Sequence, residues 1–240
     1  MFTPLLRKLK EEGYHVTVNT TDSGKKILRH NPHVDAWIIH VKDSVPNEKL
    51  GEHWDNMAKG FDKFINLSGS VEGNLLKIEG KKEFLWEHDV RHEKCNRNYY
   101  DEQFKIAGYP EVTGKNGELF FSPLEHRLAK SFAKKHRKRF KIMWSLAGSS
   151  FHKNYPYTEI VAKWLLDKYD KWDIRKSLIM TQYVDLVVGT ETGILNAAGC
   201  YDTAKVIFLS HSSEENLTKY WENTTALHVY EHVVSCYPCH

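Results

Sequence analysis

The sequence has few cysteines and no long apolar segment. Four cysteines in 240 residues are too few for a disulfide framework. No run of 18 apolar residues occurs, and such a run is the signature of a membrane-spanning helix. The first residues also lack the apolar core and small-residue cleavage site of a secretory signal. These absences predict a cytoplasmic protein with reduced thiols.

The chain also lacks a clear excess of either positive or negative charge. The chain has 34 Lys and Arg against 31 Asp and Glu, and a net charge of +3 is too small to imply a nucleic-acid partner. The densest basic run, Lys130 to Lys141, carries an apolar stripe with Leu128 and Phe132. We therefore interpret it as the solvated face of a helix rather than a phosphate- or lipid-binding patch. The expected membrane contact is peripheral at most.

Two groups of His and Cys invite a metal or haem interpretation. Cys236, Cys239 and His240 spell C-x-x-C-H, the form of a c-type haem attachment site, but that site needs export, for which no signal is seen. His88 and His92 are four residues apart and would share one face of a helix, followed by Cys95 on that face. Zinc binding would require the fold to bring the two groups together. We expect no metal, and a terminal loop at the C-terminus.

The most informative segment is DLVVGTETGILNAAG, Asp185 to Gly199. Its apolar start is typical of a buried parallel strand, which we expect to end at Gly189. Thr190 to Gly193 then form a turn, and Ile194 to Cys200 begin a helix. A strand, turn and helix start of this kind directs free backbone N–H groups and a positive dipole end at one point, which suits a phosphate. The alternative is an ordinary turn without a ligand.

Helices and strands alternate along the chain, which predicts an α/β fold with parallel sheets. The predicted N-terminal elements are a helix from Pro4 to Gly13, strands Tyr14–Thr20, Ala36–Val41 and Phe61–Leu67, and a helix Gly24–His30. The later ones are helices Tyr99–Ala107, Leu124–Arg139 and Trp172–Gln182, a helix from Thr158, strands Lys141–Leu146 and Lys205–Leu209, and a last helix with a capping box of Ser212 and Glu215. No strand is predicted between the helices from Thr158 and Trp172, where a doubly wound sheet normally has one.

Three segments of the second half resemble the family 9 glycosyltransferases, the ADP-heptose:lipopolysaccharide heptosyltransferase group. They are SLAGSSFHKNYPY from Ser145, the strand–turn–helix from Asp185, and KVIFLSHSS from Lys205. The N-terminal stretch Gly13 to Ile38 is similar to the family's acceptor domain from its second strand onward.

The resemblance implies a GT-B-like fold, in which two Rossmann-like domains with parallel sheets face each other. Residues 1–122 would form the acceptor side and residues 123–240 the nucleotide-sugar side. The first strand of one domain and one strand of the other have no counterpart here. Both domains are therefore expected to be incomplete, as in a truncated bacterial or phage copy.

The resemblance also implies the residues that bind the diphosphate of the nucleotide sugar. These residues are Ser149, Ser150, Lys153, Glu191, Thr192, Gly193 and Asn196. Glu191 stands where the family usually has Asp, and Asn196 where it usually has His. A helix N-terminus and a lysine would stabilise the departing diphosphate without a metal or other cofactor.

The function implied is transfer of a heptose-like sugar, with inversion, from a nucleotide diphosphate donor to a glycolipid or glycan acceptor. A carboxylate base should take the acceptor proton. No residue matches the family's catalytic Asp, and neither Asp22 nor Glu72 is assigned that role. One alternative is a catalytically dead remnant that at most binds nucleotide sugar. Another is a metal- or thiol-dependent protein that uses its C-terminal cysteines.

Overall fold

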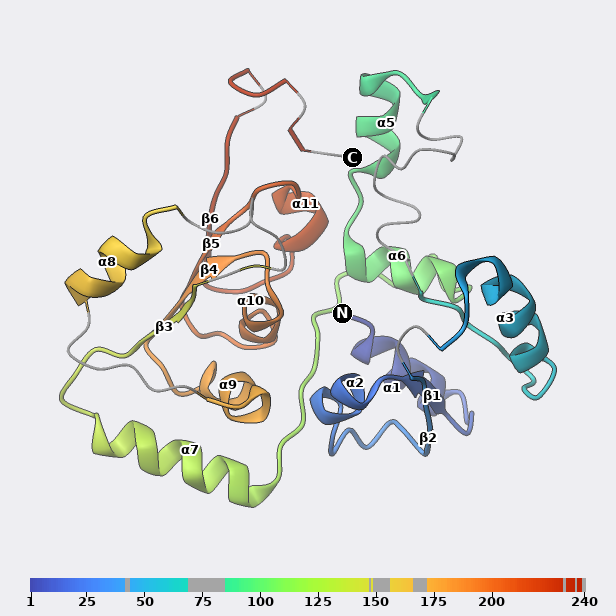
Figure 1. Ribbon diagram of the computed structural model, residues 1–240, viewed down its shortest axis with the longest axis horizontal. Coiled ribbons are helices and arrows are strands. Elements are labelled where there is room, and N and C mark those ends of the chain that lie inside the picture. Colours follow the sequence, from blue (N-terminus) through green and yellow to red (C-terminus); the bar gives the residue numbers. More distant parts are fainter. Residues whose placement is uncertain are drawn as a thin grey trace.

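The protein is an α/β structure with two separate parallel sheets (Figure 1). A two-stranded sheet lies in the N-terminal half, and a four-stranded sheet of order β3-β4-β5-β6 lies in the C-terminal half. These sheets confirm the predicted fold class. The computed structural model describes residues 1–41, 44–68, 85–146, 148, 156–165, 172–230, 232–235 and 237–238.

The N-terminal half packs helices around its small sheet. Pro4 lies in the first turn of α1, and Gly13 follows the helix with a φ of +87°, a left-handed conformation that favours glycine. Leu5, Leu6 and Leu9 share one buried face of α1 and pack in a cluster with β1. The elements are α1 (Thr3–Glu11), β1 (Thr17–Thr20), α2 (Asp22–Ile27), β2 (Ala36–Ile39), η1 (Asn47–Lys49), α3 (Leu50–Ala58), α5 (His88–Cys95) and α6 (Tyr99–Ile106).

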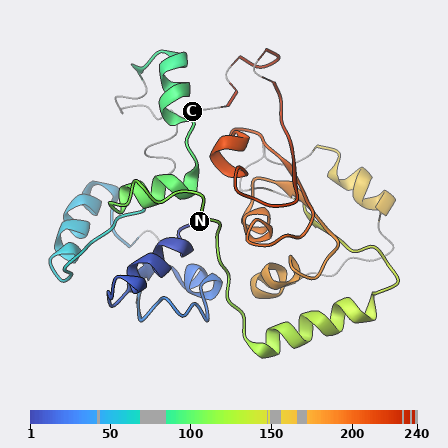
Figure 2. The same cartoon turned by 180° about the vertical axis from the view of Figure 1, so that it is seen from behind.

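The C-terminal half is built on the larger sheet. In Figures 1 and 2, α9, α10 and α11 lie on one side of this sheet and α8 lies on the other. Val187 of β4 and Ile207 of β5 are completely buried in the core between the sheet and its helices. The elements are α7 (Pro123–Lys135), β3 (Ile142–Ser145), α8 (Thr158–Leu165), α9 (Ile174–Met180), β4 (Leu186–Thr190), α10 (Gly193–Ala198), β5 (Lys205–Phe208), α11 (Glu214–Leu217) and β6 (Thr224–Leu227).

Helix α6 belongs to the cores of both halves. Phe104 packs in the N-terminal cluster, whereas Tyr99 packs in the C-terminal cluster. The hydroxyl of Tyr99 is buried and lies 2.7 Å from Ser212 Oγ, beyond the end of β5. The two halves are therefore joined by apolar packing and by a buried polar contact, not only by the chain.

Arg175 on α9 forms a second joint between the halves. Its guanidinium makes two hydrogen bonds to the Glu125 carboxylate, Nε to Oε1 at 2.7 Å and Nη2 to Oε2 at 3.0 Å. Burial alone would raise the pKa of Glu125, but hydrogen bonds from Arg175 and Ser122 outweigh it and lower the pKa to about 2. The same guanidinium donates to the carbonyls of Lys26, Ile27, Arg29 and Phe120.

Two predictions about local structure are wrong. Phe61–Leu67 was expected to be a strand, but it pairs with no strand in the described sheets. Its Ile65 and Leu67 pack on the N-terminal cluster, so the apolar pattern reflects burial without a ladder. The capping box is made by Ser213 and Asn216 rather than Ser212 and Glu215, because Ser212 is held by Tyr99 and Glu191.

The basic helix α7 buries a narrower stripe than expected. Phe132 is partly buried, as predicted, and Ala129 is buried. Leu128 is 61% exposed and does not belong to the apolar stripe. Strand β6, which pairs in parallel with β5, was not predicted.

The domain boundary between residues 122 and 123 stays a prediction. The expected absence of a strand between α8 and α9 also stays a prediction, because residues 166–171 lie outside the described part. Among the described helices, none has the length and apolar character to cross a membrane.

Candidate functional site

The polar residues of interest lie where three neighbouring strands of the C-terminal sheet end. Because β3, β4 and β5 are parallel, their carboxyl ends meet at one edge of the sheet. Ligands of open α/β sheets bind at such edges. We call this group the carboxyl-edge site, and its members are Ser145, Thr190–Gly193 and Ser210–Ser212.

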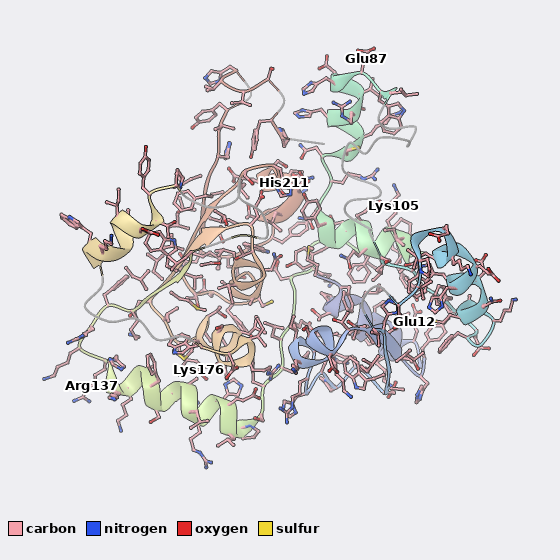
Figure 3. All side chains as sticks on the ribbon, in the orientation of Figure 1. Glu12, Glu87, Lys105, Arg137, Lys176 and His211 are labelled. Carbon is pink, nitrogen blue, oxygen red and sulfur yellow. The ribbon has the colours of Figure 1, made fainter. Side chains whose placement is uncertain are left out.

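The carboxylate of Glu191 connects the β4 turn to the loop after β5. Its Oε1 accepts hydrogen bonds from the backbone N–H groups of Ser210 at 3.2 Å and Ser212 at 2.9 Å. Its Oε2 accepts from Ser210 Oγ at 2.8 Å and lies 2.5 Å from His211 Nδ1. Figure 3 shows His211 beside α11. Glu191 thus fixes the position of the loop.

This carboxylate is held in its ionised form. Its side chain is only 5% exposed, and burial alone would raise its pKa. The contact with His211 and the hydrogen bonds from Ser212 and Ser210 outweigh burial and lower the pKa to about 2. Both carboxylate oxygens therefore have partners within the protein. Glu191 holds the loops of the carboxyl-edge site in place and does not offer a free charge to a ligand.

The turn after Glu191 presents backbone and hydroxyl groups. Thr192 is the N-cap residue of α10, but its hydroxyl lies 3.0 Å from Ser145 Oγ instead of capping the helix. Gly193 is exposed, and a Cβ there would meet no atom of the described part of the chain within 4 Å. Asn196 donates from Nδ2 to the Thr192 carbonyl, while its buried Oδ1 has no partner among the described residues. None of the described residues occupies the space next to the Cα of Gly193, at the start of α10.

Four predicted binding residues, Glu191, Thr192, Gly193 and Asn196, therefore lie together. The other three, Ser149, Ser150 and Lys153, lie outside the described residues. The strand that leads to them, β3, ends at Ser145, which is paired with Gly189 of β4. Their roles stay predictions.

The sequence patterns did not mark Ser145, Ser210 or His211 as site residues, and they assigned Ser212 to a helix cap instead. Their signal in the sequence is polar residues directly after an apolar strand, as in KVIFLSHSS. That signal marks the carboxyl end of a parallel strand, where loops carry function.

The histidines of α5 do share a face, as the spacing predicts. The rings of His88 and His92 lie 4.5 Å apart between centroids. In the described part of the chain, no group of three or more His, Cys, Asp or Glu residues is arranged to hold a metal ion. Cys236, Cys239 and His240 lie outside that part.

Gly189 should be essential for the close packing beneath the site. A Cβ at this position would lie 2.7 Å from Ser145 Cβ and 2.9 Å from Leu195 Cδ2. We expect Gly189→Ala to reduce the free energy of unfolding by about 2 kcal/mol, because β3 or α10 must move to relieve the overlap. Urea denaturation of the variant and of Gly51→Ala, whose added Cβ meets nothing within 4 Å, measures this effect. Equal stability of the two variants would contradict the packing.

A solved structure shares this fold. The crystal structure of the glycosyl transferase family 9 protein from Veillonella parvula DSM 2008 aligns with a TM-score of 0.63 and 14% sequence identity, over 97% of this chain and 84% of that chain. The chain therefore has a GT-B-like fold. No protein-family model matches the sequence, and a comparison with curated proteins gives no significant match.

Proposed function

We propose that this protein is a family 9-type glycosyltransferase that binds a nucleotide diphosphate sugar at the carboxyl-edge site. The observation that carries the proposal is the convergence of Ser145, Gly193 and the loop at His211 at one edge of a GT-B-like sheet. The likeness to a solved family 9 structure along nearly the whole chain supports it. The proposed reaction transfers a heptose-like sugar, with inversion, to a glycolipid or glycan.

The chemistry proposed for the site is electrostatic. As the sugar leaves, negative charge grows on the departing diphosphate. The exposed amide of Gly193, the Thr192 hydroxyl and the side chains of Ser149, Ser150 and Lys153 are proposed to stabilise that charge. The proposed enzyme needs no metal, works in the cytoplasm, has no nucleic-acid partner and contacts membranes only peripherally.

A second candidate is a protein that binds nucleotide sugar without transferring it. The observation that favours it is the difference between the two sheets, because the described N-terminal sheet has two strands and the C-terminal sheet has four. The C-terminal half, which is proposed to bind the donor, therefore has more described strands than the N-terminal half. Binding of a nucleotide sugar, with no transfer to water or to any tested glycan, would distinguish this candidate from an active enzyme.

The proposed function is tested by thermal unfolding with a panel of ADP-, UDP-, GDP- and CDP-sugars. A ligand at about 100 times its Kd should raise the Tm by about 5 °C or more. The matching free nucleoside diphosphate should also stabilise the protein, since the diphosphate is the group recognised. A panel in which no nucleotide sugar gives a saturable shift would reject donor binding.

Gly193→Ala should separate binding from folding. Because an added Cβ meets no atom of the described residues within 4 Å, the variant should unfold at the wild-type temperature or slightly above it. The methyl group would occupy the space above the start of α10, so we expect about a tenfold weaker Kd for the nucleoside diphosphate, measured by calorimetry. Gly51→Ala, on the distant helix α3, is the matched control and should bind normally. Unchanged affinity in Gly193→Ala would remove this glycine from the site.

A further inference from the structure

A cavity in the N-terminal half is not used by the proposed function. Its volume is about 370 Å³, and no residue of the carboxyl-edge site lines it. Strand β1 forms one wall, and residues 61 and 63–68 form another. Apolar side chains from α1 and α3 complete the lining, namely Leu5, Leu6, Leu9, Trp54 and Met57.

One edge of β1 has no neighbouring strand in the described two-stranded sheet. The carbonyls of Val16 and Thr20 accept hydrogen bonds from the β2 side, from Ala36 N at 3.2 Å and His40 N at 2.8 Å. Backbone groups of successive residues in a strand point to opposite edges. The N–H and C=O groups of Thr17 and Asn19, which both line the cavity, therefore point away from β2.

Two side chains that line the cavity have buried acceptors without a partner among the described residues. These acceptors are Asn19 Oδ1 and Gln103 Oε1. Gln103 is only 5% exposed, so water outside the molecule does not solvate it freely. A buried carbonyl oxygen without a donor costs about 1–3 kcal/mol. A group that supplies N–H donors inside the cavity would therefore satisfy both acceptors.

We propose that this cavity binds an extended apolar peptide segment of a partner protein, which pairs as a parallel strand with the edge of β1 that faces away from β2. Such a segment brings alternating N–H and C=O groups for Thr17 and Asn19, and further N–H donors toward Gln103. Its side chains would be covered on both faces, so a continuous run of Val and Ile suits it. An acyl chain fills the same apolar space but supplies no donor. The parallel direction follows from the pairing of β1 with β2.

The same geometry explains the conformation of residues 61–67. Their apolar side chains Ile65 and Leu67 pack on the core, yet the cavity lies between this segment and β1. A strand in the cavity would lie between β1 and residues 61–67, which pair with no strand of the described sheets. A doubly wound sheet has a strand at such a central position.

Hydrogen exchange on the whole protein with an added synthetic peptide tests the proposal. The probe is a blocked peptide of about five alternating Val and Ile residues, flanked by lysines for solubility. We expect saturable binding and at least about tenfold slower exchange of the Thr17 and Asn19 amides. The control peptide has proline at its centre, which removes an N–H group and should abolish binding. Equal binding of both peptides, or protection elsewhere only, would overturn strand addition.

Gln103→Met provides a matched variant. Removal of an unpaired buried carbonyl should leave the Tm of the free protein unchanged or raised, because no existing hydrogen bond of Oε1 is lost. Affinity for the Val/Ile peptide should fall about tenfold, since its donor loses an acceptor. A lower Tm with unchanged peptide affinity would show that Gln103 serves only the fold. Neither result depends on nucleotide-sugar binding, so the proposed function can fail or succeed separately.

Discussion

Glu191→Ala is expected to destabilise the protein by about 3 kcal/mol and to abolish binding of nucleoside diphosphates. The substitution leaves the backbone N–H groups of Ser210 and Ser212 without their acceptor. It also releases the loop at His211 from the turn that precedes Gly193. Urea denaturation measures the stability, and calorimetry with ADP or UDP at a temperature where the variant remains folded measures the binding.

Glu191→Gln is the matched control because it keeps the shape and one carbonyl oxygen. That oxygen can still accept from Ser210 N and Ser212 N, so about half of the lost stability should return. If the Ala and Gln variants are both as stable as the wild type, the contacts of Glu191 with Ser210 and Ser212 contribute nothing to the free energy of unfolding.

The pH dependence of stability should also distinguish the Gln variant from the wild type. The folded pKa of Glu191 is lowered from 4.5 to about 2. Its stabilisation is therefore fully present above pH 4.5 and is lost as the pH falls toward 2. The stability difference between wild type and Glu191→Gln should shrink over this window, measured between about pH 5 and 3. A constant difference would mean that the charge of Glu191 is not stabilised in the folded state.

Arg175→Ala is expected to have a comparable effect, about 3 kcal/mol, through the joint between the halves. The Arg175 side chain is 11% exposed and that of Glu125 is 21% exposed. Removal of the guanidinium therefore leaves a mostly buried carboxylate that keeps its hydrogen bonds from Ser122 but loses its charged partner. It also removes the hydrogen bond that Arg175 donates to the carbonyl of Ile27, at the carboxyl end of α2. We expect a lower Tm, and an earlier loss of protection in α2 than in β4 when hydrogen exchange is followed.

Two variants control this experiment. Arg175→Lys keeps the charge but loses the planar fork that reaches both oxygens of Glu125, so most of the destabilisation should remain. Arg137→Ala removes an exposed arginine beyond the end of α7 (Figure 3) and should change stability by less than about 0.5 kcal/mol. Equal effects of Arg175→Ala and Arg137→Ala would show that the joint is not a stabilising contact.

Much of the fold could be predicted because the strands of the C-terminal sheet are apolar and bounded by clear turns. The run before Gly189 is buried as predicted, although β4 continues to Thr190 and α10 already begins at Gly193. Strand β6 escaped prediction because TTAL contains only two apolar residues, and its pairing with β5 is a long-range contact. Periodicity reports which side chains are buried, not which backbone groups pair.

The same limit explains the other differences. Ile65 and Leu67 look like strand residues because they are partly buried, but their segment pairs with no strand of the two described sheets. In the site, the sequence identified the turn at Gly193 but not the engagement of Glu191 with Ser210–Ser212. That contact joins residues 19 to 21 positions apart, and only the fold brings them together.

The carboxyl edge of the C-terminal sheet is proposed to bind the diphosphate of a nucleotide sugar. Backbone amide NMR during a titration with ADP and UDP tests it most directly. The largest saturable shifts are predicted for Thr192, Gly193 and Ser145, with little change in the N-terminal sheet. The claim would be contradicted if those three amides did not move at saturating nucleotide, or if the shifts were centred on residues of the N-terminal half.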